Sequence, residues 1–368
     1  MRSAEQFSAM LTGEPRLWLV TGAAGFIGSN LLESLLLAGQ TAIGLDNFST
    51  GCQKNLDDVR RLVGPENWKR FRFIWGDIRD LSQCRSACEG VTHVLHQAAF
   101  CSVSRSIEDP LTSAMVNVQG FLNMLTAARD AGVRRFVYAS SSSVYGSHLA
   151  LPKREDAIGE PLSPYSATKL SNELFATAYS RCFGVQCIGL RYFNVFGPRQ
   201  DPNGAYAAVI PTWVAAVLRG EQVYINGDGE TCRDFCFIDN VVQANLRAAT
   251  TTNPNAVNHV FNIAAGRRTT LNQLFRKIRG GLSERVPGLV DVEPTYRNFR
   301  AGDVRFSEAD VSKAAALLGY EVTHDVESGL DLTLDWYVSR LGAETIPQLD
   351  LGRRMGGGSE AVGWRMAT

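Results

Sequence analysis

The chain has 368 residues, and its 37 Lys and Arg residues balance 37 Asp and Glu residues, so its formal net charge is zero. Hydrophobic residues make up 45% and charged residues 20%, a composition that supports a sizeable core and excludes a disordered protein. The absence of a basic excess argues against a general nucleic-acid or anionic-membrane binder. Since no apolar run reaches the roughly 20 residues of a membrane span, and the N-terminus lacks a signal-peptide core, we expect a cytoplasmic protein.

The first half of the chain alternates short β-rich runs with helical patterns. The expected strands cover 16–21, 42–46, 71–77, 94–99, 135–141 and 187–193. Helical spacing of apolar residues follows the first strand, from Ile27 to Leu36, and recurs at 112–131 and 164–182. This alternation predicts an α/β fold with a doubly wound parallel (Rossmann) sheet and helices on both faces.

After Asn194 the alternation becomes irregular. Helices are expected at 208–219, 239–250, 270–281, 310–318 and 327–341, with short strands at 223–225 and 260–263. We predict an N-terminal extension (1–15), a nucleotide-binding domain (16–194), a smaller, irregular C-terminal substrate-binding region (195–345) and a mobile tail (346–368). A helix and a strand near 239–266 are expected to return to the nucleotide-binding domain.

The eight cysteines show no Cys-x-x-Cys pair and no zinc-ribbon spacing, so no metal site is predicted. Cys84 and Cys88, like Cys232 and Cys236, are four residues apart, which could place each pair on one helix face. We interpret the cysteines as reduced apolar fillers.

A glycine motif, TGAAGFIG (21–28), lies between the first strand and the first helix. Gly22 permits the tight turn, Gly25 lets a pyrophosphate approach the backbone, and Gly28 lets the helix pack closely on the strand. The N-terminus of the helix then offers free N–H groups to phosphates. The motif therefore predicts a dinucleotide site.

Two acidic residues indicate which dinucleotide binds. Asp46 ends the second strand, where a carboxylate can bind the ribose hydroxyls and would repel a 2′-phosphate. Asp77 follows the third strand and can approach the adenine. The sequence therefore favours NAD over NADP.

Tyr165 and Lys169 form a Tyr-x-x-x-Lys motif, and residues four apart share a helix face. The ammonium group of Lys169 should lower the pKa of the phenol, which can then take a proton from a sugar hydroxyl while hydride leaves the same carbon. Ser140–Ser143 follow the fifth strand, where side chains are expected to point into the ligand crevice. One of these serines can relay the proton.

Together these motifs resemble the extended short-chain dehydrogenase/reductase family. LDNFSTG (45–51), HQAA (96–99), LRYFNVFGPRQDPNGAYAAVIP (190–211), YINGDGETCRDFCFIDN (224–240) and FRAGDVRFSEAD (299–310) are similar to UDP-hexose 4-epimerases, above all the bacterial branch acting on UDP-N-acetylglucosamine and its uronic acid. The resemblance covers about residues 16–340.

The resemblance implies roles for individual residues. It assigns catalysis to Tyr165, Lys169, Ser141 and Ser142. It implies that NAD contacts Gly22, Gly25, Phe26, Ile27, Gly28, Asp46, Asn47, Ser49, Thr50, Gly51, Asp77, Ile78, Gln97, Tyr165, Lys169 and Val195. It implies that the UDP-sugar contacts Ser102, Ser143, Asn194, Ala208, Val209, Tyr224, Asn226, Arg233, Arg300, Asp303 and Ser307. It also implies a homodimer formed through the helices at 112–131 and 164–182.

The implied reaction is a redox-neutral inversion at C4 of a UDP-hexose. Dehydration is disfavoured, because Ser142 and Ser143 stand where sugar dehydratases carry an Asp-Glu pair. Small residues at Ser307 and Ala208 favour UDP-N-acetylglucosamine, whereas Cys101 and Ser104 replace a glycine and a proline of that branch and could reshape the pocket. The plain hexose and the uronic acid remain alternatives. So do an NAD-dependent UDP-sugar dehydrogenase and a catalytically silent nucleotide-binding protein.

Overall fold

The computed structural model describes residues 7, 10–11, 16–203, 207–299 and 305–345. The predicted tail at 346–368 and most of the predicted N-terminal extension therefore lie outside the described residues.

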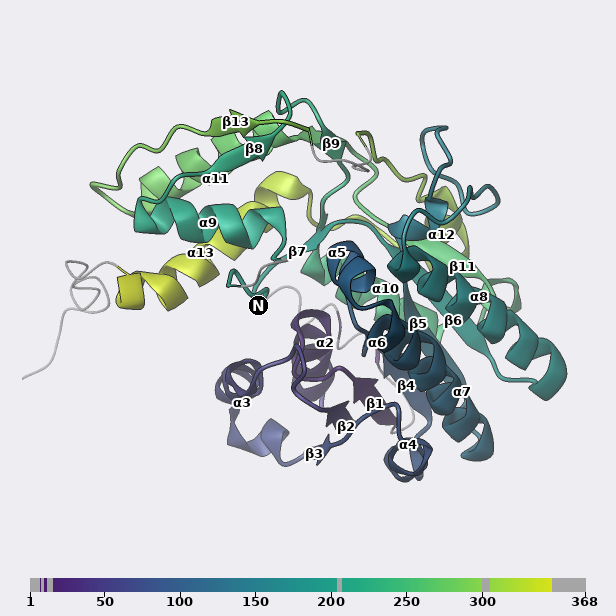
Figure 1. Cartoon of the computed structure of the whole chain (residues 1–368). Helices are drawn as coiled ribbons and strands as arrows, with labels where there is room; N and C mark the ends of the chain where they lie inside the picture. Colours follow the sequence, from purple (N-terminus) through teal and green to yellow (C-terminus); the bar gives the residue numbers. More distant parts are fainter. Residues whose placement is uncertain (1–6, 8–9, 12–15, 204–206, 300–304, 346–368) are drawn as a thin grey trace, which may run out of the picture.

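A seven-stranded parallel sheet forms the centre of the molecule (Figure 1). Its strands are β1 (Leu17–Thr21), β2 (Thr41–Asp46), β3 (Phe71–Trp75), β4 (His93–His96), β5 (Arg135–Ser141), β6 (Cys187–Tyr192) and β11 (Val260–Ile263). The strand order is β11-β6-β5-β4-β1-β2-β3, so the direction of winding reverses between β1 and β4. Such a reversal opens a crevice at the carboxyl ends of the strands. The predicted doubly wound sheet is confirmed.

Helices cover both faces of the sheet (Figure 1). One face carries α2 (Phe26–Leu37), α3 (Gln53–Trp68) and α10 (Ile238–Thr250), and the other carries α4 (Leu81–Cys88), α7 (Phe121–Asp130) and α8 (Pro164–Phe183). Side chains alternate along β1, so Trp18 and Val20 pack into the first layer and Leu19 into the second. Apart from the edge strand β3, whose residues are half-buried or exposed, the sheet is largely buried on both sides, as parallel sheets generally are.

The rest of the chain forms a second lobe beside the carboxyl ends of the strands. Its main elements are α9 (Val209–Arg219), α11 (Leu271–Arg285), α13 (Val326–Thr345) and the paired strands β8 (Tyr224–Asn226) and β13 (Thr295–Arg297). Short elements elsewhere in the chain are β7 (Val195–Phe196), β9 (Cys232–Arg233), β10 (Cys236–Phe237), β12 (Thr269–Thr270), α12 (Ser312–Leu318), η2 (Ser142–Tyr145) and η3 (Pro254–Ala256), of which η2, η3 and α12 lie beside the central sheet.

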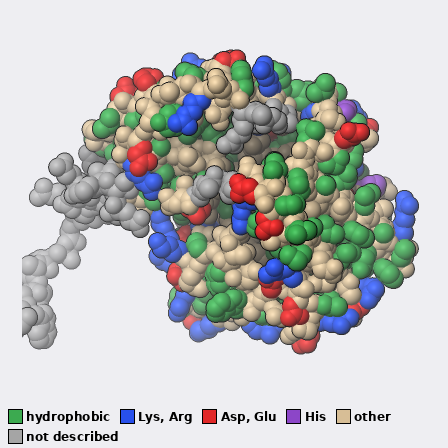
Figure 2. Space-filling model, in the orientation of Figure 1, with side chains coloured by type: hydrophobic (Ala, Val, Ile, Leu, Met, Phe, Trp, Pro, Cys, Tyr) green, Lys and Arg blue, Asp and Glu red, His purple; other side chains and the backbone are tan. Residues whose placement is uncertain are grey.

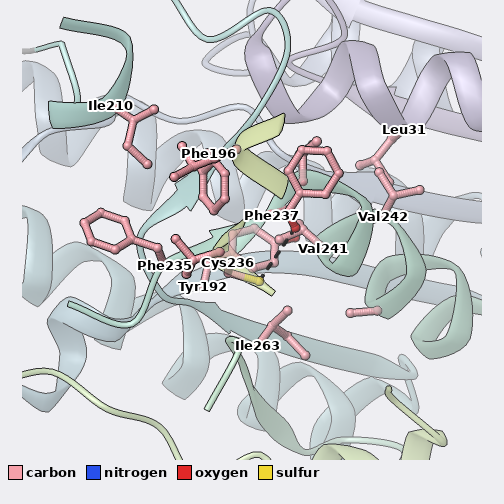
Figure 3. Close-up of a cluster of buried hydrophobic side chains, with 14 of the residues drawn as sticks. Leu31, Tyr192, Phe196, Ile210, Phe235, Cys236, Phe237, Val241, Val242 and Ile263 are labelled. Carbon is pink, nitrogen blue, oxygen red and sulfur yellow. Dashed lines mark hydrogen bonds between the residues drawn. The ribbon is translucent and has the colours of Figure 1, made fainter. Parts of the chain in front are cut away.

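A buried aromatic cluster joins this lobe to the sheet (Figure 3). Phe196 and Phe237 come from the paired strands β7 and β10, and their ring centroids lie 5.6 Å apart. Ile210 from α9 and Leu31 from α2 belong to the same cluster. Because one core spans both parts, the division near residue 194 stays a prediction.

Several predicted elements differ from the structure. The helices α3, α4 and α5 (Val103–Glu108) were not predicted. The expected continuous helix at 112–131 is instead α6 (Pro110–Ala114), the π-helical segment η1 (Met115–Gly120) and α7. A π segment has more residues per turn than an α-helix, but the six residues of η1 are too few for the apolar spacing to distinguish the two.

The cysteine predictions had mixed outcomes. Cys84 and Cys88 are both buried on α4, which confirms a shared helix. Cys232 and Cys236 lie on the separate strands β9 and β10, so the helical alternative was wrong for that pair. Cys52, Cys101 and Cys182 are exposed, so they do not fit the interpretation as fillers. Within the described ranges, no helix has the length and apolar character needed to cross a bilayer.

Candidate active site

The glycine turn brings backbone to the floor of the crevice. Gly22 follows β1 with a φ of 68°, and a Cβ added there would lie 2.9 Å from the Ala98 nitrogen. A Cβ at Gly28 would lie 2.0 Å from the Gly22 oxygen, so only glycine lets α2 pack against the turn. No side chain caps the start of α2 at Gly25. Its first N–H groups and positive dipole end therefore face the crevice, as an anion site requires.

Two carboxylates stand at the ends of β2 and β3. Asp46 accepts hydrogen bonds from the backbone nitrogens of Ala24 (2.9 Å) and Phe48 (2.8 Å). Burial raises the pKa of Asp46, and these hydrogen bonds oppose the shift. Asp77 pairs with Arg79 at 2.7 Å, which is the main cause of lowering its pKa to about 2. Both carboxylates border the crevice.

Tyr165 and Lys169 lie one turn apart at the start of α8. Ser163 caps this helix by accepting a hydrogen bond from the Ser166 nitrogen at 3.1 Å. The Lys169 ammonium donates a hydrogen bond to the Ala139 carbonyl of β5 at 2.9 Å, and its Nζ lies 5.8 Å from the Tyr165 ring centroid. The Tyr-x-x-x-Lys motif is therefore buried against the end of β5, and Tyr165 lines the same cleft as Ser141.

The electrostatics differ from the prediction. Burial raises the pKa of the Tyr165 phenol well above its usual value, the Cys101 thiol raises it further, and the hydrogen bond with Ser141 acts in the opposite direction. Burial also lowers the pKa of the Lys169 ammonium to about 8. The net shift of the phenol pKa is therefore opposite to the one expected from the Lys169 ammonium, because desolvation of the phenolate dominates.

Ser140, Ser141, Ser142 and Ser143 all border the crevice, as predicted, but their hydroxyls make different contacts. Ser140 donates a hydrogen bond to the buried Glu173 carboxylate at 2.5 Å. The Ser141 hydroxyl accepts one from the Ser143 nitrogen at 3.1 Å. Ser142 and Ser143 border the crevice, and the Ser143 hydroxyl has no hydrogen-bond partner in the part of the chain that the structure describes. Strand alternation separates Ser140 from Ser141.

One cleft of about 600 Å³ brings most of the predicted residues together. All the predicted cofactor residues except Gly51 line it, as do Ser141, Ser142, Ser143, Ser102 and Asn194. Gly51 lies behind the glycine turn, where a Cβ would be 2.7 Å from the Ala24 carbonyl carbon. The cleft therefore extends from the glycine turn, past Asp46, to Tyr165 at the end of β5.

The other predicted substrate residues lie on the second lobe, outside the lining of this cleft. They are Ala208, Val209, Tyr224, Asn226, Arg233 and Ser307. Ala208 precedes α9, and Tyr224 lies under the Arg297 guanidinium, whose central carbon is 3.2 Å from the ring centroid. Arg300 and Asp303 fall outside the described residues.

Sequence reasoning missed several lining residues. Tyr192 donates a hydrogen bond to Gln97 at 3.1 Å, and Phe100 and Gln200 also border the cleft. Each lies in or beside a segment that carries the family resemblance, and this position in the sequence could have identified them as cleft residues. Among the described residues, no group of three or more His, Cys, Asp or Glu side chains is arranged to hold a metal ion.

Comparisons with known proteins agree with this geometry. The model of the NAD dependent epimerase/dehydratase family matches residues 18–264. A UDP-glucose 4-epimerase of Mycolicibacterium smegmatis is 38% identical over 321 residues, which are 87% of this chain and 97% of that protein.

Two solved structures are similar along their whole length. The UDP-glucose 4-epimerase of Thermotoga maritima with UDP-glucose is 37% identical with a TM-score of 0.79, over 88% of this chain and 99% of that one. The UDP-N-acetylglucosamine 4-epimerase of Methanobrevibacter ruminantium in complex with UDP-N-acetylmuramic acid is 33% identical with a TM-score of 0.81, over 89% of this chain and 100% of that one. With its glycine turn, acidic strand end and buried Tyr-Lys pair, the chain belongs to the NAD-dependent epimerase/dehydratase family.

Proposed function

We propose that the protein inverts C4 of a UDP-hexose, with UDP-N-acetylglucosamine and UDP-N-acetylgalactosamine as the interconverted pair. The observation that carries this proposal is the meeting of Tyr165, Lys169 and Ser141 in the same cleft as the glycine turn. Oxidation and re-reduction of a carbon that bears a hydroxyl group require a base and a dinucleotide-binding site in the same cleft.

The residues present fit NAD. Gly22 and Gly28 keep side chains away from the start of α2, where uncapped N–H groups suit a pyrophosphate. Asp46 has the charge and position to bind ribose hydroxyls. Bound NAD supplies the hydride acceptor for C4 oxidation, the hydride donor for reduction of the opposite face, and a positive charge beside the phenol.

The chain's own groups handle the proton. Tyr165 takes the proton of the C4 hydroxyl, and Ser141, which lines the same cleft, holds the reacting oxygen. Lys169, anchored on the Ala139 carbonyl, orients the nicotinamide ribose. Since burial opposes ionisation of the phenol, the base depends on nearby positive charge. Tyr165 returns the proton when the 4-keto sugar has turned over.

The second lobe binds the UDP end in this proposal. Arg233 and Arg300 hold the diphosphate, as arginine is suited to do, and Asn194 lies near the sugar phosphate. The remaining predicted substrate residues surround the nucleotide and the sugar. Ser307 and Ala208 are small, which leaves room for an N-acetyl group.

UDP-glucose is the second candidate substrate. The 38% identical relative from Mycolicibacterium smegmatis carries the name UDP-glucose 4-epimerase, and this supports the plain hexose. The exposed Cys101 also adds bulk beside Tyr165, where a larger sugar has less room. An NAD-dependent dehydrogenase would differ by accumulating NADH.

The direct experiment uses the purified protein with UDP-N-acetylglucosamine, UDP-glucose, UDP-glucuronate and UDP-N-acetylglucosaminuronate in separate reactions. Chromatographic separation should show the C4 epimer of the acetylated sugar at the highest rate, without net NADH. Faster conversion of UDP-glucose would favour the second candidate. Net NADH would support a dehydrogenase, and NAD binding without conversion of any sugar would support a silent binding protein.

We also propose a cytoplasmic homodimer. Leu111, on α6, is 75% exposed, and Leu174, on α8, is 64% exposed. Figure 2 shows hydrophobic side chains gathered on the part of the surface where Figure 1 places α5, α6 and α8. In contrast, Phe121 and Leu125, from the predicted helix at 112–131, are buried against the sheet.

Light scattering tests the dimer. The variant Leu174→Glu should give a monomer, because a charge in an apolar interface costs binding energy. The matched change Leu332→Glu, on α13, should leave the mass unchanged, since Leu332 is exposed on the other lobe. A wild-type monomer would contradict the proposal.

A further inference from the structure

Three residues spaced by four on α8 lie against three consecutive residues of β5. Tyr165 and Ser141 line the same cleft, Lys169 donates a hydrogen bond to the Ala139 carbonyl at 2.9 Å, and Glu173 accepts one from the Ser140 hydroxyl at 2.5 Å. The first two contacts belong to the site described above. The third involves Ser140, which also borders the cleft, and has no part in the proposed proton transfer.

Glu173 is also held from the next strand. Arg191, on β6, donates from Nε to one Glu173 oxygen at 2.9 Å and from Nη2 to the other at 2.8 Å. Both side chains are buried, and the Arg191 guanidinium lies over the Tyr145 ring at 4.9 Å. A bidentate pair in this setting fixes the angle of the carboxylate as well as its position.

The pair therefore joins α8, β5 and β6 at one point. Because the Ser140 hydroxyl donates to the same Glu173 oxygen that Arg191 Nε contacts, the end of β5 is tied to the carboxylate. Any shift of α8 along β5 would break this short hydrogen bond, and it would also change the distance from Tyr165 to Ser141. An apolar contact would not resist such a shift, since it has no preferred direction.

We propose that Glu173, held by Arg191, is a positioning residue that acts through Ser140 to set the distance between the Tyr165 phenol and the Ser141 hydroxyl. This inference rests on the proposed function. It predicts that loss of the Ser140 contact impairs the chemical step more than the binding of cofactor or substrate.

Ser140→Ala is the appropriate variant, because it removes the contact and leaves the Glu173–Arg191 pair intact. The matched control is Ser171→Ala on α8, where the hydroxyl donates a hydrogen bond to the Ala167 carbonyl of the preceding turn at 2.9 Å. Ser140→Thr keeps a hydroxyl and serves as the rescue variant.

The measurements are kcat and KM for the converted UDP-sugar, the amount of NAD retained, and the thermal midpoint. For Ser140→Ala we expect kcat to fall about ten-fold, with KM and retained NAD within about two-fold of wild type. Ser140→Thr should restore most of kcat, and Ser171→Ala should match wild type. Unchanged kcat in Ser140→Ala would overturn the inference. A higher KM, less retained NAD and a lower thermal midpoint, none of them restored by Ser140→Thr, would show a structural role. That result would overturn the inference too.

A second readout does not need turnover. The pH at which Tyr165 ionises can be read as the ultraviolet difference between each variant and the same variant carrying Tyr165→Phe. Ser140→Ala should shift this pH, and Ser171→Ala should not. An inactive wild-type protein would refute the proposed function alone, whereas an unshifted phenol would refute the positioning role.

Discussion

The Cys101 thiol lies 3.8 Å from the phenol oxygen of Tyr165 and donates a hydrogen bond to it. The residue after Cys101, Ser102, has a φ of 138°, a backbone conformation that favours glycine. Asn117 holds this segment by accepting a hydrogen bond from the Phe100 nitrogen at 2.7 Å. A strained segment that brings a thiol to the proposed base suggests that Cys101 affects proton transfer.

Replacing Cys101 with alanine should therefore make the phenol easier to ionise. A negative charge on the Cys101 sulfur disfavours the phenolate and raises the pKa of Tyr165, so removal of the sulfur lowers that pKa. Because the base acts in its ionised form, the acidic limb of the kcat–pH profile should move to lower pH. Cys182 is an exposed cysteine on α8, away from Tyr165 in sequence, and the kcat–pH profile of Cys182→Ala should not move. A profile that moved to higher pH in Cys101→Ala would contradict the electrostatic argument.

Tyr165→Phe should retain NAD and the fold but lose epimerisation by about 100- to 10,000-fold, the usual contribution of a general base. The phenol is buried, so phenylalanine fills the same space. Product formation by chromatography measures the loss, and the amount of NAD that co-purifies serves as the control. Activity within ten-fold of wild type would reject Tyr165 as the base.

The buried pair behind the serines should have a measurable effect on stability. Arg191→Met leaves the Glu173 carboxylate buried without its cation, and we expect the free energy of unfolding to fall by about 3–5 kcal/mol. The double variant Glu173→Leu/Arg191→Met should recover much of that loss, because neither charge remains. Urea denaturation of the two variants and wild type gives the comparison. Equal loss in the single and double variants would show that packing, not charge, determines the effect.

The size of residue 307 should influence which sugar is accepted. In the proposed pocket Ser307→Tyr removes the room for an N-acetyl group, so kcat/KM for UDP-N-acetylglucosamine should fall at least about ten-fold more than that for UDP-glucose. Competition between the two sugars in one reaction measures this ratio directly. An unchanged ratio would place the acetyl group elsewhere.

The parts of the fold predicted correctly are those in which the information is local. The spacing of Gly22 and Gly28, and of Tyr165 and Lys169, specifies a turn and a helix face, and the structure places these residues in one cleft. The helix α3 was missed because Gly64, with a φ of 76°, and Pro65 interrupt its pattern.

The parts that failed depend on partners distant in sequence. The direction of the Ser140 hydroxyl depends on Glu173, which lies 33 residues away, and on Arg191. The raised pKa of Tyr165 depends on how deeply the tertiary structure buries the phenol. Neither can be deduced from spacing along the chain, because spacing does not specify which segments pack together.

The proposed reaction returns hydrogen to the carbon that lost it, and isotope labelling tests this most directly. UDP-N-acetylglucosamine carrying deuterium at C4 should give UDP-N-acetylgalactosamine with the deuterium still at C4, as read by mass spectrometry and NMR of the separated product. Release of the label to solvent, or its accumulation in free reduced cofactor, would contradict the account.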